Sequence, residues 1–156
     1  VSRECSKYGY EPVMLTDQLC CQAKEAGSFL ASIAKTHCKS GKKLAYIAGG
    51  ETIVNITGHG KGGRNQEIAL SAAEGIKGMP NAAVFSIGSD GTDGPTDAAG
   101  GYSDGDTAGV LKNKGIDIFE VLKNNDAYNA LKLTEGLIIT GPTGTNVNDV
   151  SVLLIG

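Results

Sequence analysis

The chain has 156 residues, of which 40% are hydrophobic and 20% are charged, and this is enough for one globular domain with its own core. Its 14 Lys and Arg residues are outnumbered by 17 Asp and Glu residues, which gives a formal net charge of −3. Without a basic block, neither nucleic acid nor an anionic membrane is an expected partner. No run approaches the ~18 consecutive apolar residues of a transmembrane helix.

Four cysteines occur without a C-x-x-C pair, so neither a disulfide framework nor a zinc site is expected, and reduced thiols predict a cytoplasmic protein. The chain begins with Val1 instead of Met and opens directly into helix-compatible sequence. This opening indicates a fragment, a processed form or a shortened form of a longer protein.

The first predicted elements alternate between helix and strand. Residues 1–9 are expected to be the end of a helix that stops at Gly9, and residues 12–16 are expected to form a short apolar strand. A second helix is predicted after Asp17, a candidate N-cap, because apolar residues recur at steps of three and four as far as Ala34. This order is typical of an α/β protein.

Two further strands are predicted around a pair of glycines. Residues 44–48 form an apolar run, and residues 51–57 alternate between apolar and polar side chains. Gly49 and Gly50 between them indicate a bend, a bulge or a tight hairpin. The alternation favours a strand with one wet face, so we expect a mixed β-sheet flanked by helices.

The rest of the chain is expected to alternate between regular elements and three long polar loops. The predicted elements are a helix at about 64–76, a buried strand at 82–87, helices near 106–113 and 117–132, and strands at 137–140 and 150–155. The three loops are 58–63, 88–105 and 141–149, and they hold most of the clustered glycines among the 23 in the chain.

The first loop, Gly58-His59-Gly60-Lys61-Gly62-Gly63, is followed by Arg64 and a predicted helix. Its glycines would let backbone N–H groups approach a ligand, and the positive end of the helix would favour an anion. Two other interpretations stay open. One is a glycine-rich turn whose basic residues point into water; the other is a G-x-G-x-x-G dinucleotide fingerprint, which is weak because the strand before it alternates.

The second loop places Asp90, Asp93 and Asp97 within eight residues after a buried strand. Three carboxylates so close would repel one another unless a cation lay among them, and Mg²⁺ prefers a few carboxylate oxygens with water and substrate phosphate. A calcium loop of the EF-hand type is not expected, because its acidic twelfth position is missing. The alternative is that these residues form turns and helix caps.

The third loop, Gly141-Pro142-Thr143-Gly144-Thr145-Asn146-Val147-Asn148-Asp149, also follows a short strand. Its hydroxyl and amide groups are candidates for contacts with sugar-acid or phosphate oxygens, and Asp149 is placed to orient a neighbour. The alternative is a connection rich in side-chain turns.

These loops together resemble the MOFRL domain of glycerate 2-kinases. The resemblance rests on four segments in the same order and spacing, over roughly residues 43–153. They are Gly49-Gly50-Glu51-Thr52, Gly60 to Glu67, Ser89 to Gly100, and Gly141 to Asp149. Residues 1–42 resemble the last strand and helix of the preceding domain in that family, so we expect a boundary between residues 1–42 and a MOFRL domain at 43–156.

The resemblance implies ATP- and Mg²⁺-dependent phosphorylation of D-glycerate to 2-phosphoglycerate, in a cleft shared with a larger N-terminal kinase domain. The family's catalytic lysine is expected in that domain, so this chain is expected to be inactive alone. A dinucleotide-dependent enzyme resembling hydroxypyruvate reductase and a non-catalytic nucleotide-binding module stay open as alternatives, and so does a homo-oligomer.

Carried onto this chain, the resemblance implies three groups of site residues. Arg64, Asp90 and Asp93 would be catalytic, with Arg64 offsetting charge on the transferring phosphoryl group. Asp90 and Asp93 would bind Mg²⁺ or align the attacking hydroxyl, with support from Asp97. The expected nucleotide contacts are Gly60, Lys61, Gly62, Gly63, Asn65, Thr143, Gly144 and Asn146.

Overall fold

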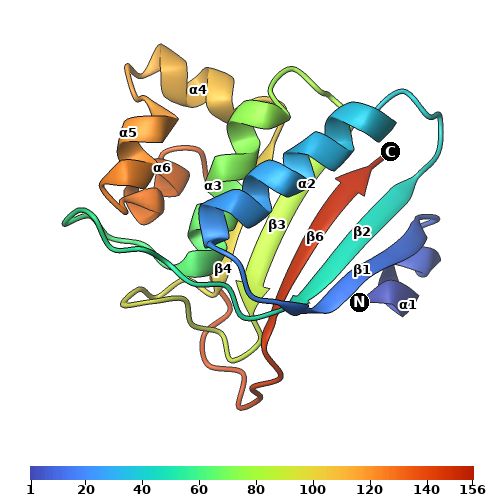
Figure 1. Cartoon of the computed structure of the whole chain (residues 1–156), viewed down its shortest axis with the longest axis horizontal. Coiled ribbons are helices and arrows are strands. Elements are labelled where there is room, and N and C mark those ends of the chain that lie inside the picture. Colours follow the sequence, from blue (N-terminus) through green and yellow to red (C-terminus); the bar gives the residue numbers. More distant parts are fainter.

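A computed structural model describes all residues from Val1 to Gly156, and it contains six helices and six strands (Figure 1). The helices are α1 (Ser2–Lys7), α2 (Ala23–His37), α3 (Arg64–Gly75), α4 (Thr107–Asn113), α5 (Ile118–Lys123) and α6 (Ala127–Lys132). The strands are β1 (Glu11–Leu19), β2 (Leu44–Gly50), β3 (Ala82–Gly88), β4 (Gly100–Asp104), β5 (Leu137–Ile138) and β6 (Asp149–Ile155). None of the helices is both long and apolar enough to span a lipid bilayer.

The six strands form one mixed sheet in the order β1-β2-β6-β3-β4-β5, which confirms the predicted fold class. β1 and β2 are parallel, and every other neighbouring pair is antiparallel. The last strand in the chain is therefore inserted between β2 and β3. Because β6 runs against both neighbours, its first residues lie beside the last residues of β2 and β3.

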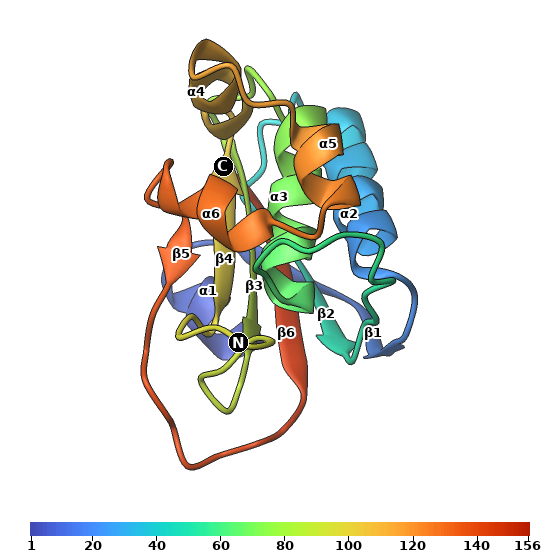
Figure 2. The same cartoon turned by 90° about the vertical axis from the view of Figure 1, so that its left-hand side faces the viewer.

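Helices α2 and α3 cover one face of the sheet, while α1 lies on the opposite side (Figure 2). One core cluster joins α2 and α3 to the central strands, and a second joins α3 to α4, α5 and α6. Helix α3 takes part in both, with Ile68 and Ala72 in the first cluster and Leu70 and Ala73 in the second. This buried helix therefore fixes the position of the residues at its N-terminus.

Four sequence predictions were wrong about local structure. Asp17 is not a helix N-cap: it lies within β1, and Gln22 occupies the N-cap of α2. Residues 51–57 form no strand, apart from one isolated bridge between Ile53 and Gln22. The reason is tertiary, because β1 and β6 already occupy both edges of β2 and leave no partner for a hairpin after Gly50.

The third error is β4, which the sequence prediction placed inside a long loop. Its two glycines are needed for close approach: a Cβ at Gly100 would overlap with the carbonyl of Ser86 in β3, and one at Gly101 with Leu131. Glycine in a strand often marks such a close contact. The predicted helix at 117–132 is also divided into α5 and α6, where Asn125 takes the left-handed conformation with φ 56°.

The packing of α2 on α3 depends on a glycine. A Cβ at Gly27 would overlap with the side chain of Ser71 and the carbonyl of Ile68 on α3. We predict that Gly27→Ala lowers the free energy of unfolding by about 2 kcal/mol, as overpacked cores do. The control is Gly109→Ala in α4, where a Cβ would meet nothing within 4 Å. Urea denaturation measures both, and equal stability of the two variants would contradict the proposed close contact.

Candidate functional site

All three glycine-rich or aspartate-rich loops lie at one edge of the sheet, namely where β2 and β3 end and β6 begins (Figure 1). In the strand register Asp149, the first residue of β6, pairs with Gly50 at the end of β2 and with Gly88 at the end of β3. Arg64 begins α3 at the same edge. The antiparallel insertion of β6 thus brings together residues from four parts of the chain.

The centre of this edge is an ion pair between Arg64 and Asp149. The Nε of Arg64 donates to Oδ2 of Asp149 in a very short contact, and Nη2 donates to Oδ1 at 3.1 Å. The carboxylate is nearly buried, at 7% exposure, whereas the arginine side chain is 31% exposed. The hydrogen bond to Asp149 raises the pKa of Arg64. This two-point contact fixes the plane of the guanidinium and leaves Nη1 without a protein partner.

Two further carboxylates lie near the guanidinium. Oε1 of Glu51 is 3.3 Å from Nη2 of Arg64. Asp90 is half-buried, and its Oδ1 accepts hydrogen bonds from the backbone N–H and the hydroxyl of Thr92. These bonds lower the pKa of Asp90, and the charge of Arg64 lowers it further. Asp90 is therefore ionised at neutral pH, and it lies near enough to Arg64 for the guanidinium charge to affect its pKa.

Asp93 has a different role from the one that the sequence suggested. It is 1% exposed, and its carboxylate accepts hydrogen bonds from the backbone N–H groups of Asn65 and Gln66 at 3.1 and 2.9 Å. A Cβ at Gly63 would overlap with this carboxylate. Asp93 thus caps the N-terminus of α3, and burial raises its pKa despite these bonds. The helix end predicted to bind an anion already holds a carboxylate of the protein itself.

Asn65 is likewise unavailable to a ligand. It is fully buried, its Nδ2 donates to Asp93 at 3.2 Å, and its Oδ1 accepts from the hydroxyl of Ser86 at 2.5 Å. Ser86 in turn shares a hydrogen bond of 2.8 Å with Ser151. This buried polar network ties α3 to β3 and β6. The geometry assigns Asn65 to positioning, not to the predicted nucleotide contact.

The glycines of the first loop pack against the turn between α5 and α6. A Cβ at Gly58 or Gly60 would overlap with Asn124, and the amide of Gly60 donates to the Asn124 carbonyl at 2.8 Å. The amide of Lys61 donates to Asp126 at 2.8 Å. The predicted phosphate contact through Gly60 is therefore corrected, since that amide already has a partner. The amides of Gly62 and Gly63 have no hydrogen-bond acceptor in the protein.

Lys61 and Asp97 are linked through one tyrosine. The Nζ of Lys61 lies 3.9 Å from the ring centroid of Tyr128, whose hydroxyl donates to Asp97 at 2.7 Å. The hydrogen bond from Tyr128 lowers the pKa of Asp97. A cation over an aromatic face is stabilised by the ring quadrupole. This chain of contacts places Lys61 and Asp97 against α6.

The third loop contacts the second beside Asp90. The backbone N–H of Thr143 donates to the carbonyl of Asp90 at 3.1 Å, and its hydroxyl donates to the carbonyl of Ser89 at 2.5 Å. Gly144 has φ 72° and open space around it, and Asn146 is exposed. Thr143, Gly144 and Asn146 thus lie in a loop that is fastened to the aspartate-rich loop.

The three aspartates do not form a single cation-binding cluster. No group of three or more His, Cys, Asp or Glu side chains lies close enough to hold a metal ion. Asp93 is buried under α3, and Asp97 is hydrogen-bonded to Tyr128. Asp90 is half-buried, and its carboxylate accepts side-chain and backbone hydrogen bonds from Thr92 alone. Mg²⁺ needs only one or two protein carboxylates when substrate phosphates supply further oxygens, and Asp90 fits that smaller requirement.

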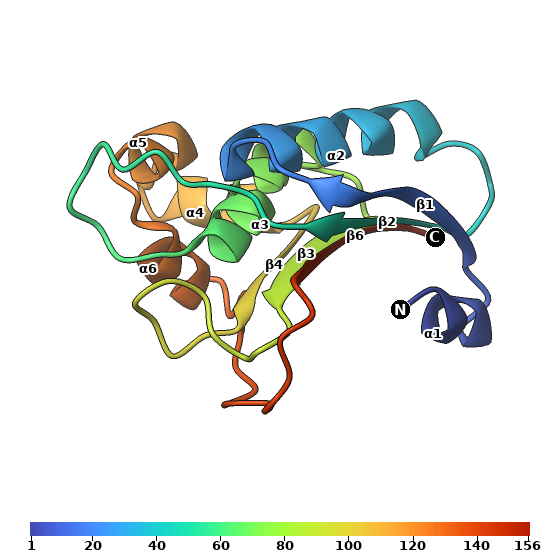
Figure 3. The ribbon, with the colours of Figure 1, turned by 60° about the horizontal axis from the view of Figure 1, so that its bottom comes forward.

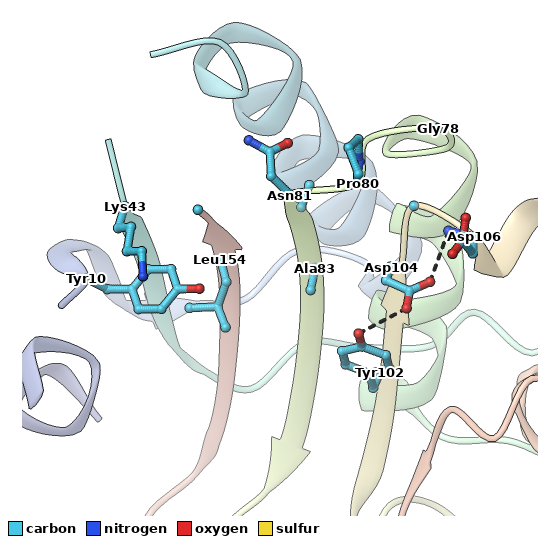
Figure 4. Close-up of a pocket in the computed structure, with 13 residues that line it drawn as sticks. Tyr10, Lys43, Gly78, Pro80, Asn81, Ala83, Tyr102, Asp104, Asp106 and Leu154 are labelled. Atoms are coloured by element: carbon cyan, nitrogen blue, oxygen red, sulfur yellow. Dashed lines mark hydrogen bonds between the residues drawn. The ribbon is translucent and has the colours of Figure 1, made fainter. Parts of the chain in front are cut away.

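A cleft of about 550 Å³ opens at the opposite edge of the sheet (Figure 4). Asp104 lines it, but one oxygen of its carboxylate accepts from the Tyr102 hydroxyl, and the other from Thr107 and the backbone N–H of Asp106. These bonds fasten the start of α4 and leave no convergent set of free polar groups. We therefore place the candidate site at the edge that holds Arg64.

Comparison with known proteins identifies the family. The sequence profile described as the MOFRL family matches residues 44–149. The chain belongs to the MOFRL family. It is 54% identical over 151 residues to a D-glycerate 2-kinase of Thermotoga maritima, a match that covers 94% of this chain and 36% of that protein. It is also 39% identical to a putative hydroxypyruvate reductase of Agrobacterium vitis, over 95% of this chain and 40% of that one.

The fold agrees as well. The crystal structure of a glycerate kinase from Thermotoga maritima matches with a TM-score of 0.95 and 51% sequence identity, over 99% of this chain and 38% of that chain. The MOFRL chain thus spans little more than a third of the relatives it matches. Most of each relative has no counterpart in these 156 residues.

Four residues near the site carried no clear signal in the sequence. Glu51 and Glu67 resemble ordinary surface acids, yet one is beside Arg64 and the other is 4% exposed. Asn125 and Tyr128 come from a helical region about 60 residues away, and they reach the first loop only through tertiary contacts. Asparagine often takes the left-handed conformation at a helix end, as Asn125 does. The residue type at this position was therefore the one local clue that a helix ends there.

The capping role of Asp93 can be tested by stability. We predict that Asp93→Ala lowers the free energy of unfolding by about 2 kcal/mol or more, because two helix N–H groups and the Asn65 amide lose a buried acceptor. The matched control is Asp106→Ala, because Asp106 occupies the N-cap of α4 without a side-chain capping bond. Urea titrations of both variants check this, and a loss at Asp106 as large as that at Asp93 would contradict it.

Proposed function

We propose that this MOFRL chain forms one wall of the active site of a glycerate kinase, which uses ATP and Mg²⁺ to phosphorylate D-glycerate to 2-phosphoglycerate. The single observation that carries the proposal is the guanidinium of Arg64, held in a fixed plane by Asp149 and near enough to the half-buried Asp90 to lower the pKa of its carboxyl. The names of the Thermotoga maritima relatives favour the same activity.

Phosphoryl transfer requires mainly positioning and stabilisation of charge on the transferring group. The unpaired Nη1 of Arg64 supplies hydrogen-bond donors for the equatorial phosphoryl oxygens, and no proton needs to leave the guanidinium. Because Asp149 holds the opposite edge of the guanidinium, little side-chain freedom is lost when phosphate binds. Asp90 would hold Mg²⁺, which would neutralise charge on the phosphate oxygens.

The remaining donors surround this centre. The amides of Gly62 and Gly63 lack protein acceptors, and they are the part of the first loop that we assign to phosphate. Lys61 adds positive charge beside them from its place over Tyr128. Thr143, Gly144 and Asn146 are kept as contacts to substrate or phosphate oxygens, since their loop is fastened to Asp90. Asp97 supports the site from a distance through Tyr128.

The charge balance explains why this wall needs a second one. Arg64 is opposed by Asp149 and Glu51, with Asp90 nearby, so carboxylates outnumber the one guanidinium. An ATP polyphosphate would meet net repulsion here unless Mg²⁺ and a further cation were present. We assign that cation to the lysine expected in an N-terminal kinase domain. We also retain the boundary between residues 1–42 and 43–156, although β1 and α2 are continuous with the sheet and core described above.

A dinucleotide-dependent reductase gains little from the geometry. The G-x-G-x-x-G fingerprint needs a strand immediately before it and a free helix N-terminus for the pyrophosphate. Residues 51–57 form no strand, and Asp93 occupies the start of α3. A relative's name as a putative hydroxypyruvate reductase remains the argument for this second candidate. A shift in NADH absorbance or fluorescence on mixing would revive it.

The central test is an ADP-release assay with ATP, Mg²⁺ and D-glycerate. We expect turnover by the longer polypeptide that carries this sequence and none by the 156-residue chain alone, because the chain lacks the second cationic wall. Turnover by the chain alone would overturn the two-wall proposal. Tight nucleotide binding without turnover by the longer polypeptide would indicate a non-catalytic nucleotide-binding module.

The role of Arg64 predicts a specific kinetic loss. In the longer polypeptide, Arg64→Ala should lower kcat at least ~10²-fold, since donors placed for transition-state charge contribute that much. Arg64→Lys should not restore the rate, because an ammonium cannot replace the planar fork. The control is Arg3→Ala, since Arg3 is exposed on α1. Unchanged turnover in the Arg64 variants would remove this residue from the mechanism.

The proposed metal contact predicts a change in Mg²⁺ dependence. Asp90→Asn should raise the Mg²⁺ concentration for half-maximal activity about tenfold, because a charged ligand becomes neutral. Asp97→Asn, whose carboxylate is bonded to Tyr128, should shift it much less. Titration of activity with Mg²⁺ compares the two variants. Equal effects would assign the metal to both aspartates, and no effect in either would assign it elsewhere.

A further inference from the structure

A second cleft, of about 490 Å³, lies next to Arg64. It is enclosed by the irregular segment 51–56, the glycines of the first loop, the start of α3 and residues 94–95. Figure 3 shows that the segment after β2 extends away from the sheet toward α5 and α6. Its volume is within the range of small-molecule sites, which is roughly 300–1,000 Å³. Its walls are mostly apolar side chains and glycine backbone, including Ile53, Val54, Ile56 and Pro95.

Two buried polar side chains line this cleft without a full set of partners. Glu67 is 4% exposed, and only its Oε1 accepts a hydrogen bond, from Nδ2 of Asn125 at 2.9 Å. Burial raises the pKa of Glu67. Thr52 is also 4% exposed, and its hydroxyl has no hydrogen-bond partner at all. A buried hydroxyl without a partner is costly, so Thr52 indicates a group that the protein does not supply, and the second carboxylate oxygen of Glu67 is free to accept a hydrogen bond from a ligand.

The charges of the cleft restrict what that group is. Glu67 lies inside and Glu51 at the rim, while Arg64, the one cation among the lining residues, is already paired with Asp149. A carboxylate or phosphate next to Glu67 would be repelled by it, so phosphate is confined to the part of the cleft lined by Gly62, Gly63 and Arg64. A neutral ligand with a flat apolar body and N–H or O–H donors satisfies the walls and the acceptors together.

We propose that this cleft binds the nucleoside moiety of the phosphoryl donor, with the base against Ile53, Ile56 and Pro95 and its donor groups directed to Glu67 and Thr52. The inference rests on the proposed function for the phosphate chain. Because Arg64 lines the same cleft, a polyphosphate that leaves the nucleoside meets the guanidinium at the rim. One ligand therefore occupies both the cleft and the catalytic edge.

The first test uses adenosine, which carries no phosphate, in an NMR titration of the 156-residue chain. We expect amide shifts in residues 51–56, Gly94 and Asn125. Shifts that concentrate instead around Tyr102 at the opposite edge, or no shifts up to millimolar adenosine, would overturn the proposal. Inosine and 2′,3′-dideoxyadenosine identify the donor: weaker binding of the first assigns the 6-amino group to the acceptors, and weaker binding of the second assigns the ribose hydroxyls.

The second test uses Glu67→Gln, which keeps the shape of the side chain but replaces the free acceptor oxygen with a donor. We expect adenosine to bind about tenfold more weakly, in line with the loss of one hydrogen bond to a charged group. In the longer polypeptide the KM for ATP should rise by a similar factor with kcat unchanged. The control is Glu74→Gln on the exposed side of the same helix. Thermal unfolding of both variants identifies a loss of folding.

The outcomes separate this inference from the kinase proposal. If glycerate is phosphorylated but adenosine shifts map outside the cleft, the nucleoside site is wrong and the kinase proposal stands. If no phosphoryl transfer occurs but the amide shifts caused by adenosine map to residues 51–56 and Glu67→Gln weakens adenosine binding, the nucleoside site stands and the kinase proposal falls. If Glu67→Gln is unfolded, Thr52→Val and the wild-type shift map still decide the question.

Discussion

The geometry of the edge that holds Arg64 depends on one buried carboxylate. Asp93 belongs to the aspartate-rich loop after β3, yet its oxygens accept the first free N–H groups of α3. A helix that starts under such a cap cannot shift relative to the loop without exposing two donors and a charge. The position of Arg64, one residue after Gly63, follows from this constraint. The same constraint keeps Arg64 near Asp90, which lies three residues before Asp93 in the sequence.

A second constraint is the balance of charge around Arg64. A guanidinium between Asp149 and Glu51 is well oriented but has little net attraction for a polyanion. This arrangement orients the guanidinium accurately instead of increasing its affinity for a polyanion, since the hydrogen-bond donors are fixed before the ligand arrives. It also makes the edge dependent on cations from elsewhere, which is consistent with relatives that are almost three times as long as this chain. The adjacent cleft, with its apolar walls, would contribute binding that does not rely on charge.

The glycines show how one residue type serves two purposes. Gly58 and Gly60 allow the first loop to lie against the turn between α5 and α6, and Gly100 allows β4 to approach β3. At these positions the absence of a side chain serves packing within the protein. Gly63 also makes room for the carboxylate of Asp93, but the amides of Gly62 and Gly63 have no acceptor in the protein. Glycine clusters in a sequence therefore locate the closely packed edge of this fold, and only the contacts separate packing from binding.

The sequence alone determined the α/β class, the mixed sheet, most helices and strands, and the loops that contain the site, because hydrophobic periodicity and turn residues are local signals. It could not decide that residues 51–57 leave the sheet, since that depends on β6 being inserted beside β2 from the far end of the chain. Likewise, Asp93 and Asp90 are alike in sequence, and only the tertiary structure made one a buried helix cap and left the other half-buried in the loop before it. Burial and partners are set by contacts between distant segments, which local patterns do not encode.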